Sequence, residues 1–285
     1  MDHVIGVIGG SGLYEIPGLA GEWRTVSTPW GDPSDALFDG RIGDARVVFL
    51  PRHGRGHRLD PASVPYRANV AAMKAAGVTH LVSVSACGSF REEMAPGDFV
   101  IVDQFIDRTV ARDRSFFGPG CVAHVPFAHP TCAAWSHACA DAARAAGATV
   151  HEGGTYLAME GPQFSTAAES RLHRDSYGCA VVGMTNMPEA RLAREAELHY
   201  CTMAMVTDYD AWHPDHDAVD VAQVVATLRA NVDLARRAVA GLLEQAVADC
   251  GAGCANALDH AVITAPDARD AETVDRLRTI LGPRV

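Results

Sequence analysis

The chain has 285 residues, of which 48% are hydrophobic and 21% are charged. A chain of this length buries about 75% of its unfolded surface, so we expect a full hydrophobic core without stabilising cross-links. The formal net charge is −11 at pH 7, which excludes the broad basic surface that a general nucleic-acid-binding protein needs.

Apolar strands alternate with helices along the chain. In chain order the pattern predicts a strand at 4–8, a strand at 46–50, a helix at 64–77, a strand at 80–85, a strand at 99–103, a helix at 132–147, a strand at 155–159, a helix at 167–177, a strand at 180–182, a helix at 188–198, a strand at 200–206 and a helix at 219–248. This order predicts an α/β fold, with helices on both faces of a sheet. No repeat or linker divides residues 1–285, so we expect one domain, in which the tail 250–285 is the least clearly assigned part.

Polar groups follow several of the predicted strands. They are the loop at 9–12, the run at 52–58, the segment at 85–89 and the segment at 207–210. Ligands of α/β proteins bind at the carboxyl ends of the strands, so we expect these segments to converge on one site.

Two of these segments carry groups suited to an oxyanion. The loop at 9–12 supplies glycine N–H groups and the Ser11 hydroxyl, but it matches neither the dinucleotide fingerprint nor the P-loop, and an ordinary tight turn explains it equally well. The run at 52–58 is densely cationic, although a solvated basic loop is the simpler interpretation of such a run. Together with Ser85 and Ala86, the Arg52 and His53 side chains complete a set of donors for inorganic phosphate.

Asp208 and Asp210 point to the same side of an extended segment. Crowding of the two carboxylates raises the pKa of one of them, which leaves an acid that can protonate a leaving group. The competing interpretation is an aspartate-rich loop that caps a helix. Phe164 follows Glu160-Gly161-Pro162 and either stacks on a planar ligand or lies in the core.

The histidines and cysteines do not show the spacing of a metal site. No C-x-x-C motif occurs, and no carboxylate or cysteine near His53 and His57 completes a set of metal ligands. We expect no metal, and we expect Cys250 and Cys254 to be two free thiols rather than a disulfide. The chain contains no run of about 18 apolar residues and begins without a basic leader, so we expect a cytoplasmic protein.

Seven longer motifs occur in a fixed order: GVIGGSGL, PRHGRGH, SACGSFREE, DQFIDRT, EGPQFST, GMTNMPE and TDYDAW. With them the chain resembles the trimeric purine nucleoside phosphorylase family from about Val4 to Ala248. The resemblance implies a three-layer domain with a mixed central sheet, a homotrimer and no cofactor, with inorganic phosphate as co-substrate. It also implies reversible phosphorolysis of S-methyl-5'-thioadenosine to adenine and 5-methylthioribose 1-phosphate.

The resemblance also assigns roles to individual residues. It implies that Asp208 is the catalytic acid and that His124 lies near a neighbouring subunit's site. The implied phosphate-binding residues are Ser11, Arg52, His53, Ser85, Ala86 and Thr185. The implied nucleoside-binding residues are Phe164, Ser165, Met184, Asp208, Asp210, Val221 and Val225.

The side chains that would meet the base favour adenine. Its amino group is a donor that carboxylates such as Asp208 and Asp210 accept, whereas a 6-oxopurine is better met by an amide. The 5' substituent stays open, because Val221 and Val225 would accept methylthio, halo or deoxy groups. The alternatives are a phosphorylase for such a nucleoside or for a 6-oxopurine nucleoside, a non-catalytic nucleoside-binding module, and a hydrolase that uses water.

Overall fold

The computed structural model describes residues 3–10, 13–214, 221–245, 250–251 and 253–284. The described strands form one mixed, 11-stranded sheet whose main path runs in the order β2-β3-β4-β1-β5-β10-β9-β7. A branch leaves this path at β5, which also pairs with β11, followed by β6 and β8. The bounds are β1 (Val4–Gly9), β2 (Ala20–Arg24), β3 (Leu37–Ile42), β4 (Ala45–Pro51), β5 (His80–Ser89), β6 (Phe99–Val102), β7 (Gln104–Asp107), β8 (Val150–Glu152), β9 (Thr155–Ala158), β10 (Val181–Gly183) and β11 (His199–Asp208).

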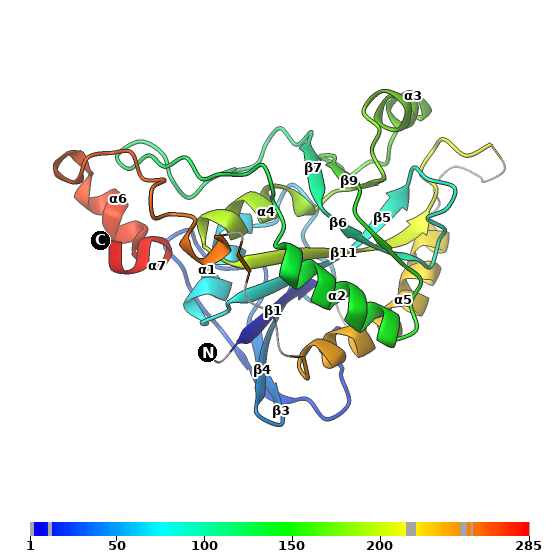
Figure 1. Ribbon diagram of the computed structural model, residues 1–285, viewed down its shortest axis with the longest axis horizontal. Coiled ribbons are helices and arrows are strands. Elements are labelled where there is room, and N and C mark those ends of the chain that lie inside the picture. Colours follow the sequence, from blue (N-terminus) through cyan, green and yellow to red (C-terminus); the bar gives the residue numbers. More distant parts are fainter. Residues whose placement is uncertain (1–2, 11–12, 215–220, 246–249, 252, 285) are drawn as a thin grey trace.

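Helices cover both faces of this sheet (Figure 1). The helices α1 (Tyr66–Ala75), α4 (Asn186–Glu195) and α7 (Arg278–Leu281) contribute to one layer. The helices α2 (Ala133–Ala145) and α5 (Val221–Leu242) pack against each other in the other layer. The short helix α3 (Ala167–Arg171) lies at one end of the molecule, and α6 (Ala271–Arg276) lies next to α7 (Figure 1).

The two layers exist because alternate side chains of each central strand point to opposite faces. In β1, Ile8 packs into the core under α1 and α4, whereas Val7 packs into the core under α2 and α5. In β11, Ala204 joins the first of these cores and Met203 joins the second. The three-layer α/β fold with a mixed sheet is therefore confirmed.

The predicted strand at 80–85 is too short. Strand β5 continues to Ser89 because its second half has pairing partners, with Ala86 opposite Met205 of β11 and Gly88 opposite Val182 of β10. The sequence prediction also missed β2, β3, β7 and β8. Strand β2 is largely exposed and β7 and β8 are short, so none of these three has the apolar run on which the prediction depended.

The tail beyond α5 packs on the same core as the rest of the chain. Leu258, Leu277 and Ile280 are buried in the core beneath α1 and α4. Cys250 and Cys254 are free thiols. None of the helices within the described ranges is long and apolar enough to cross a membrane.

Candidate active site

The register of four parallel strands brings the predicted loops to one edge of the sheet. Ile8 of β1 lies opposite Leu50 of β4 and Ser83 of β5, and Ser83 lies opposite Thr202 of β11. The strands β1 and β4 end just beyond this row, while β5 and β11 run on. The site therefore has a floor at the ends of the shorter strands and a wall formed by the longer two.

Arg52 lies at this floor with its side chain only 2% exposed. Its Nε and Nη2 donate to the Glu189 carboxylate at 2.9 and 3.2 Å, and its Nη1 donates to the Val84 carbonyl at 3.1 Å. Burial alone would lower the pKa of Arg52, but the charge and hydrogen bonds of Glu189 raise it above its ordinary value. The Arg52 N–H bonds the Gly9 carbonyl at 2.9 Å, so the first loop and the cationic run are adjacent, as predicted.

The other two arginines of the cationic run share one carboxylate of the protein. Arg55 forms an ion pair of 2.7 Å with Asp35, and Arg58 lies 3.9 Å from the same carboxylate. The side chains of Arg55 and Arg58 are 48% and 62% exposed. Asp35 balances one of these two charges, so the three groups together keep a net charge of +1.

His53 is half-buried, and its Nδ1 lies 2.8 Å from the Leu59 carbonyl. A carbonyl oxygen only accepts, so Nδ1 carries the proton and donates it to this bond. Burial, followed by the charge of Arg52, lowers the pKa of His53 to about 4. The imidazole is therefore neutral at pH 7, with Nε2 as an acceptor.

Two hydroxyl groups meet beside Arg52. Ser85 Oγ and Thr185 Oγ1 are 2.9 Å apart, although 100 residues separate them in the chain. Both residues are 6% exposed, and Ala86 beside them is half-buried. Thr185 is the residue immediately before α4, whose second residue, Met187, has a non-helical backbone. This pair brings together two of the predicted phosphate-binding segments.

Tyr156 is a residue of this region that sequence analysis missed. Its side chain is fully buried in β9. Burial raises the pKa of Tyr156 to about 12, although the nearby Ser85 side chain and Thr185 backbone act to lower it. Within the described structure its hydroxyl has no hydrogen-bond partner. A Cβ atom on Gly183 would come within 1.9 Å of this oxygen, so only glycine leaves space for it. The apolar stretch 155–159 gave no signal that a buried hydroxyl lies in this region.

Asp208 ends β11 at the wall of the site. Its carboxylate accepts hydrogen bonds from Thr207 Oγ1 at 2.7 Å and from the Asp210 N–H at 2.8 Å. Burial raises the pKa of Asp208, and the neighbouring Asp210 carboxylate adds a smaller contribution. The predicted rise is therefore present, but desolvation rather than crowding is its main cause.

Asp210 is 6% exposed and has a left-handed backbone with φ of 50°. Its buried Oδ2 has no hydrogen-bond partner among the described residues. Gly88 allows the close packing of both carboxylates, because a Cβ there would lie 2.8 Å from Asp208 Oδ1 and 3.3 Å from the Asp210 Cβ. The site therefore presents a carboxyl group with a raised pKa beside a buried, unused acceptor.

The hydroxyl pair and the two carboxylates lie at different heights along β5. Ser85 pairs with Ala204, and Gly88 pairs with Asp208. Three residues of strand separate these positions by about 10 Å. This spacing leaves room for a sugar-sized group between an anion at the floor and a base at the wall.

A second missed residue, Arg112, joins two loops of the site. Its Nη1 donates to the carbonyls of Met184 and Met187 at 2.6 and 2.7 Å, and its Nη2 donates to the Glu160 carbonyl at 2.8 Å. The Met184 side chain lies against Gly161, where a Cβ would come within 2.5 Å of its sulfur. Arg112 sits in an ordinary charged stretch of sequence, which gave no sign of this role.

The remaining predicted residues are more exposed. Phe164 is 41% exposed, and Ser165 Oγ lies 3.8 Å from Met159 Sδ. Val225 is 38% exposed on α5. His124 is exposed and its N–H donates to the Ala261 carbonyl at 2.8 Å, which anchors this segment to the tail. Ser11 and the side chain of Val221 lie outside the described residues.

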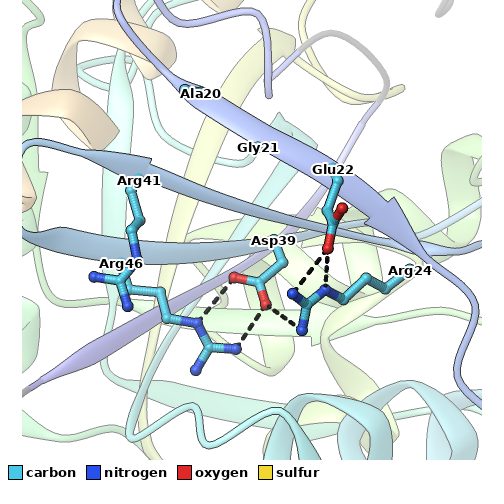
Figure 2. Close-up of a pocket in the computed structure, with 7 residues that line it drawn as sticks. All are labelled: Ala20, Gly21, Glu22, Arg24, Asp39, Arg41 and Arg46. Atoms are coloured by element: carbon cyan, nitrogen blue, oxygen red, sulfur yellow. Dashed lines mark hydrogen bonds and ion pairs between the residues drawn. The ribbon is translucent and has the colours of Figure 1, made fainter.

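Two hollows on the surface lie elsewhere. One of about 620 Å³ is lined by Ala20, Gly21, Glu22, Arg24, Asp39, Arg41 and Arg46 (Figure 2). Two of its three arginines form ion pairs within the lining, because Arg46 binds Asp39 at 2.8 Å and Arg24 bridges Glu22 and Asp39 at 2.8 and 3.4 Å. The third, Arg41, donates to the Asp44 carbonyl at 3.2 Å. Another of about 570 Å³ lies near Gln104, Ser136 and Arg194. The described lining of these two hollows includes none of the predicted site residues.

The fold and the arrangement of this edge define the class of protein. Residues 4–248 match the family model of the phosphorylase superfamily, and the chain belongs to this family. A curated relative from Cereibacter sphaeroides is 63% identical over 99% of this chain and 98% of its own length. Another from Bradyrhizobium diazoefficiens is 54% identical over 98% of this chain and 97% of its own. Both are named S-methyl-5'-thioadenosine phosphorylase.

Solved structures agree with this assignment. A methylthioadenosine phosphorylase from an antarctic soil metagenomic library is 42% identical, covers 99% of this chain and all of its own, and superposes with a TM-score of 0.90. The methylthioadenosine phosphorylase of Schistosoma mansoni, in complex with adenine, is 38% identical over 85% of this chain and 91% of its own, with a TM-score of 0.79. The resemblance stated from the sequence motifs is confirmed.

Proposed function

We propose that the protein cleaves the N-glycosidic bond of S-methyl-5'-thioadenosine with inorganic phosphate, giving adenine and 5-methylthioribose 1-phosphate. The observation that carries this proposal is Asp208, an acid with a raised pKa at the wall of the site, about 10 Å along the strands from the Ser85–Thr185 hydroxyl pair. The enzyme class is supported by full-length relatives with this activity in their names.

The chemistry divides between the two ends of the site. Asp208 in its protonated form donates its proton to N7 of the base while the bond from C1' to N9 breaks. The sugar passes through an oxocarbenium-like state, and a phosphate oxygen forms the new bond to C1'. The phosphate dianion also stabilises the positive charge that develops on the sugar. This reaction requires no metal and no organic cofactor.

The phosphate is held at the floor by hydrogen-bond donors. Ser85, Thr185 and the remaining Nη1 hydrogen of Arg52 supply these donors, with Ala86, His53 and Ser11 around them. The support for this assignment is the short distance between Ser85 and Thr185 and the position of Arg52 beside Val84. The Tyr156 hydroxyl, buried and unpartnered among the described residues, supplies a further donor to the same region.

Adenine is favoured over a 6-oxopurine by the unused acceptor at the wall. The N6 amino group of adenine donates to Asp210 Oδ2, which is buried and lacks a partner in the described part of the protein. A 6-oxopurine would place a second acceptor against this oxygen, and sites that leave such groups unpaired discriminate by about 10⁴ or more. Met184 covers the ribose, Phe164 and Ser165 line the base, and Val221 and Val225 face the 5'-methylthio group.

We further propose that the protein acts in the cytoplasm as a homotrimer, in which His124 contributes to a neighbouring subunit's site. Free cysteines throughout the described residues support a reducing compartment. Static light scattering measures the assembly: a mass of three chains is expected, and a monomer would contradict this part of the proposal.

A substrate panel tests the reaction. Methylthioadenosine, adenosine, 5'-halo-deoxyadenosines and inosine are incubated with the protein, with and without phosphate, and release of the base is measured. Phosphate-dependent release of adenine, fastest from methylthioadenosine, is expected. Faster cleavage of inosine would contradict the base assignment, and equal cleavage without phosphate would show hydrolysis instead.

A further inference from the structure

Four side chains with metal-binding atoms meet at the far end of β11 from Asp208. They are Cys132, His199, Cys250 and Cys254, and one ligand atom from each lies within 4.8 Å of all the others. Cys132 Sγ is 3.4 Å from His199 Nδ1, and Cys250 Sγ is 3.3 Å from Cys254 Sγ. The three cysteines and the histidine come from separate segments: the start of α2, the start of β11 and the chain beyond α5.

We propose that these four residues bind a structural Zn²⁺ ion. Three thiolates and one imidazole form one of the ligand sets of structural zinc sites. With Zn–S bonds of about 2.3 Å and a Zn–N bond of about 2.0 Å, tetrahedral ligands are separated by roughly 3.5–3.8 Å. The measured separations of 3.4 and 3.3 Å approach these values, so small rotations of the side chains complete the geometry.

The surroundings of the cluster hold two of its ligands in place. Cys132 is the residue immediately before the 13-residue helix α2, so its position is set by the start of that helix. The His199 ring stacks on His80 at 4.3 Å, which fixes its plane with Nδ1 toward Cys132. Binding converts three thiols to thiolates and releases three protons, so the complex carries a net charge of −1.

A closed set of four protein ligands leaves no position for a substrate, so the ion is structural. It would join the start of α2 and the start of β11 to the segment that follows α5. The Cys132 N–H already bonds the Tyr200 carbonyl at 2.8 Å, and the metal extends this junction to Cys250 and Cys254. His199 and Asp208 lie at opposite ends of β11, roughly 30 Å apart. The zinc site is thus separate from the proposed catalytic site and does not depend on it.

The test measures metal directly. The full chain is purified under reducing conditions without chelator, and zinc is quantified by mass spectrometry. About one zinc per chain is expected. Replacement of zinc by Co²⁺ should produce thiolate-to-cobalt charge-transfer absorption and the visible bands of a tetrahedral site.

Variants separate this cluster from the other thiols. Cys254→Ala removes one of the four ligands. It should weaken zinc retention against a chelator by at least about 10- to 100-fold, because loss of a group that only hydrogen-bonds a ligand already lowers metal affinity by that factor. Cys121→Ala, which removes a buried thiol outside the cluster, should retain zinc fully. His199→Cys keeps four ligands, so it should still bind cobalt with a more intense thiolate absorption. This variant distinguishes loss of a ligand from general damage to the fold.

Two results would overturn the proposal. One is reduced protein that contains no zinc and takes up no cobalt with thiolate absorption. The other is a Cys250–Cys254 disulfide as the stable form under the same reducing conditions, detected by mass spectrometry of peptides. Neither result bears on phosphorolysis, which the substrate panel tests separately.

Discussion

Single residues of the site hold their charge largely out of contact with water. Arg52 and Glu189 form an ion pair whose side chains are 2% and 1% exposed. Glu189 also accepts a hydrogen bond from the Tyr200 hydroxyl at 3.1 Å. Such a pair fixes the position of Arg52, because either charge alone would be buried without compensation.

Glu189→Gln should therefore destabilise the protein strongly. The amide keeps the size of the side chain but leaves the Arg52 charge unpaired, at a cost of about 3–5 kcal/mol in the free energy of unfolding. Urea unfolding measures this quantity. Asp275→Asn is the control, because its pair with Arg278 is exposed and should change the free energy by less than about 1 kcal/mol. Equal effects of the two substitutions would refute the role of burial.

Asp208→Asn should separate activity from stability. We expect kcat to fall about 10²- to 10⁴-fold, because the amide cannot protonate the base. Since the pKa of Asp208 is raised in the folded protein, ionisation of this carboxyl costs stability above its unfolded value of 3.8. The Asn variant escapes that cost, so its stability at pH 7 should stay within about 1 kcal/mol of the parent or exceed it.

The local bonds accommodate this substitution. Thr207 Oγ1 can donate to the Cys87 carbonyl at 3.2 Å and accept from the new amide. Steady-state kinetics and thermal unfolding are the two measurements. Near-normal turnover of adenine nucleosides would remove Asp208 from the mechanism.

The sequence assigned roles to residues whose neighbours form motifs, and it gave no signal of those that reach the same region from ordinary segments. Ser85, Thr185 and Asp208 were assigned because long motifs surround them. Tyr156 lies in an apolar strand, and its proximity to Ser85 arises only when β9 and β5 are brought together by β10. The partner of Arg52, Glu189, is 137 residues away, a distance that no local pattern spans.

At the scale of elements, the length of β5 and β11 positions the acid. These strands pair from His80 and His199 to Gly88 and Asp208, with an irregularity after Val206. The irregularity increases the local twist and turns the end of β11, where Asp208 and Asp210 share one side of the chain. At Gly88, β5 passes so close to Asp208 and Asp210 that a Cβ there would contact both residues.

Gly88→Ala should misplace Asp208 and leave the fold intact. The new Cβ would lie 2.8 Å from Asp208 Oδ1, 3.2 Å from Val182 Cγ1 and 3.3 Å from the Asp210 Cβ. Since Thr207 and the Asp210 N–H hold the carboxylate, the strands themselves must shift. We expect kcat to fall about 10- to 100-fold, with a loss of stability of about 1–3 kcal/mol.

Gly118→Ala is the matched control, because nothing lies within 4 Å of its Cβ position. Its kinetics should equal those of the parent protein. If Gly88→Ala also left the rate of adenine release unchanged, the close packing at Gly88 would have no catalytic significance.

Elements were predicted well where both faces are buried. Strands β1, β4 and β11 were located because their sequences are predominantly apolar and short, which is typical of buried strands. The strands β2 and β3 were missed because they are not buried on both faces. Their aromatic residues Trp23 and Phe38 pack on each other and on Tyr14 at the edge of the sheet. The end of β5 was also missed, since Gly88 and Ser89 read as a loop until their pairing with β10 is known.

At the scale of the whole molecule, histidines shielded from water contribute to the response to acid. The folded-state pKa of His53 is lowered to about 4 and that of His80 to about 3, both mainly by burial, from an ordinary value of 6.5. Between the ordinary value of 6.5 and these lower folded-state values, the two histidines bind more protons in the unfolded chain than in the folded protein. Stability is therefore full above about pH 6.5 and is lost as the pH falls toward 4 and below.

Urea unfolding between pH 7 and pH 4 should show this loss directly. The free energy of unfolding should decrease steadily below pH 6.5. His53→Gln should make the decrease shallower, because one of the suppressed protonation sites is removed. A stability that is flat over this range would contradict burial as the cause.

The tautomer of His53 also determines which anions the protein can use. Its Nδ1–H is committed to Leu59 at 2.8 Å, so Nε2 offers only a lone pair to an anion in the proposed phosphate site. Hydrogen phosphate and hydrogen arsenate carry a proton that can satisfy this acceptor, whereas sulfate carries none at neutral pH. We expect arsenate to replace phosphate in releasing adenine and sulfate to be a much weaker competitor, as measured by inhibition at equal ionic strength. Selection among tetrahedral oxyanions would then depend on the proton they carry rather than on their charge.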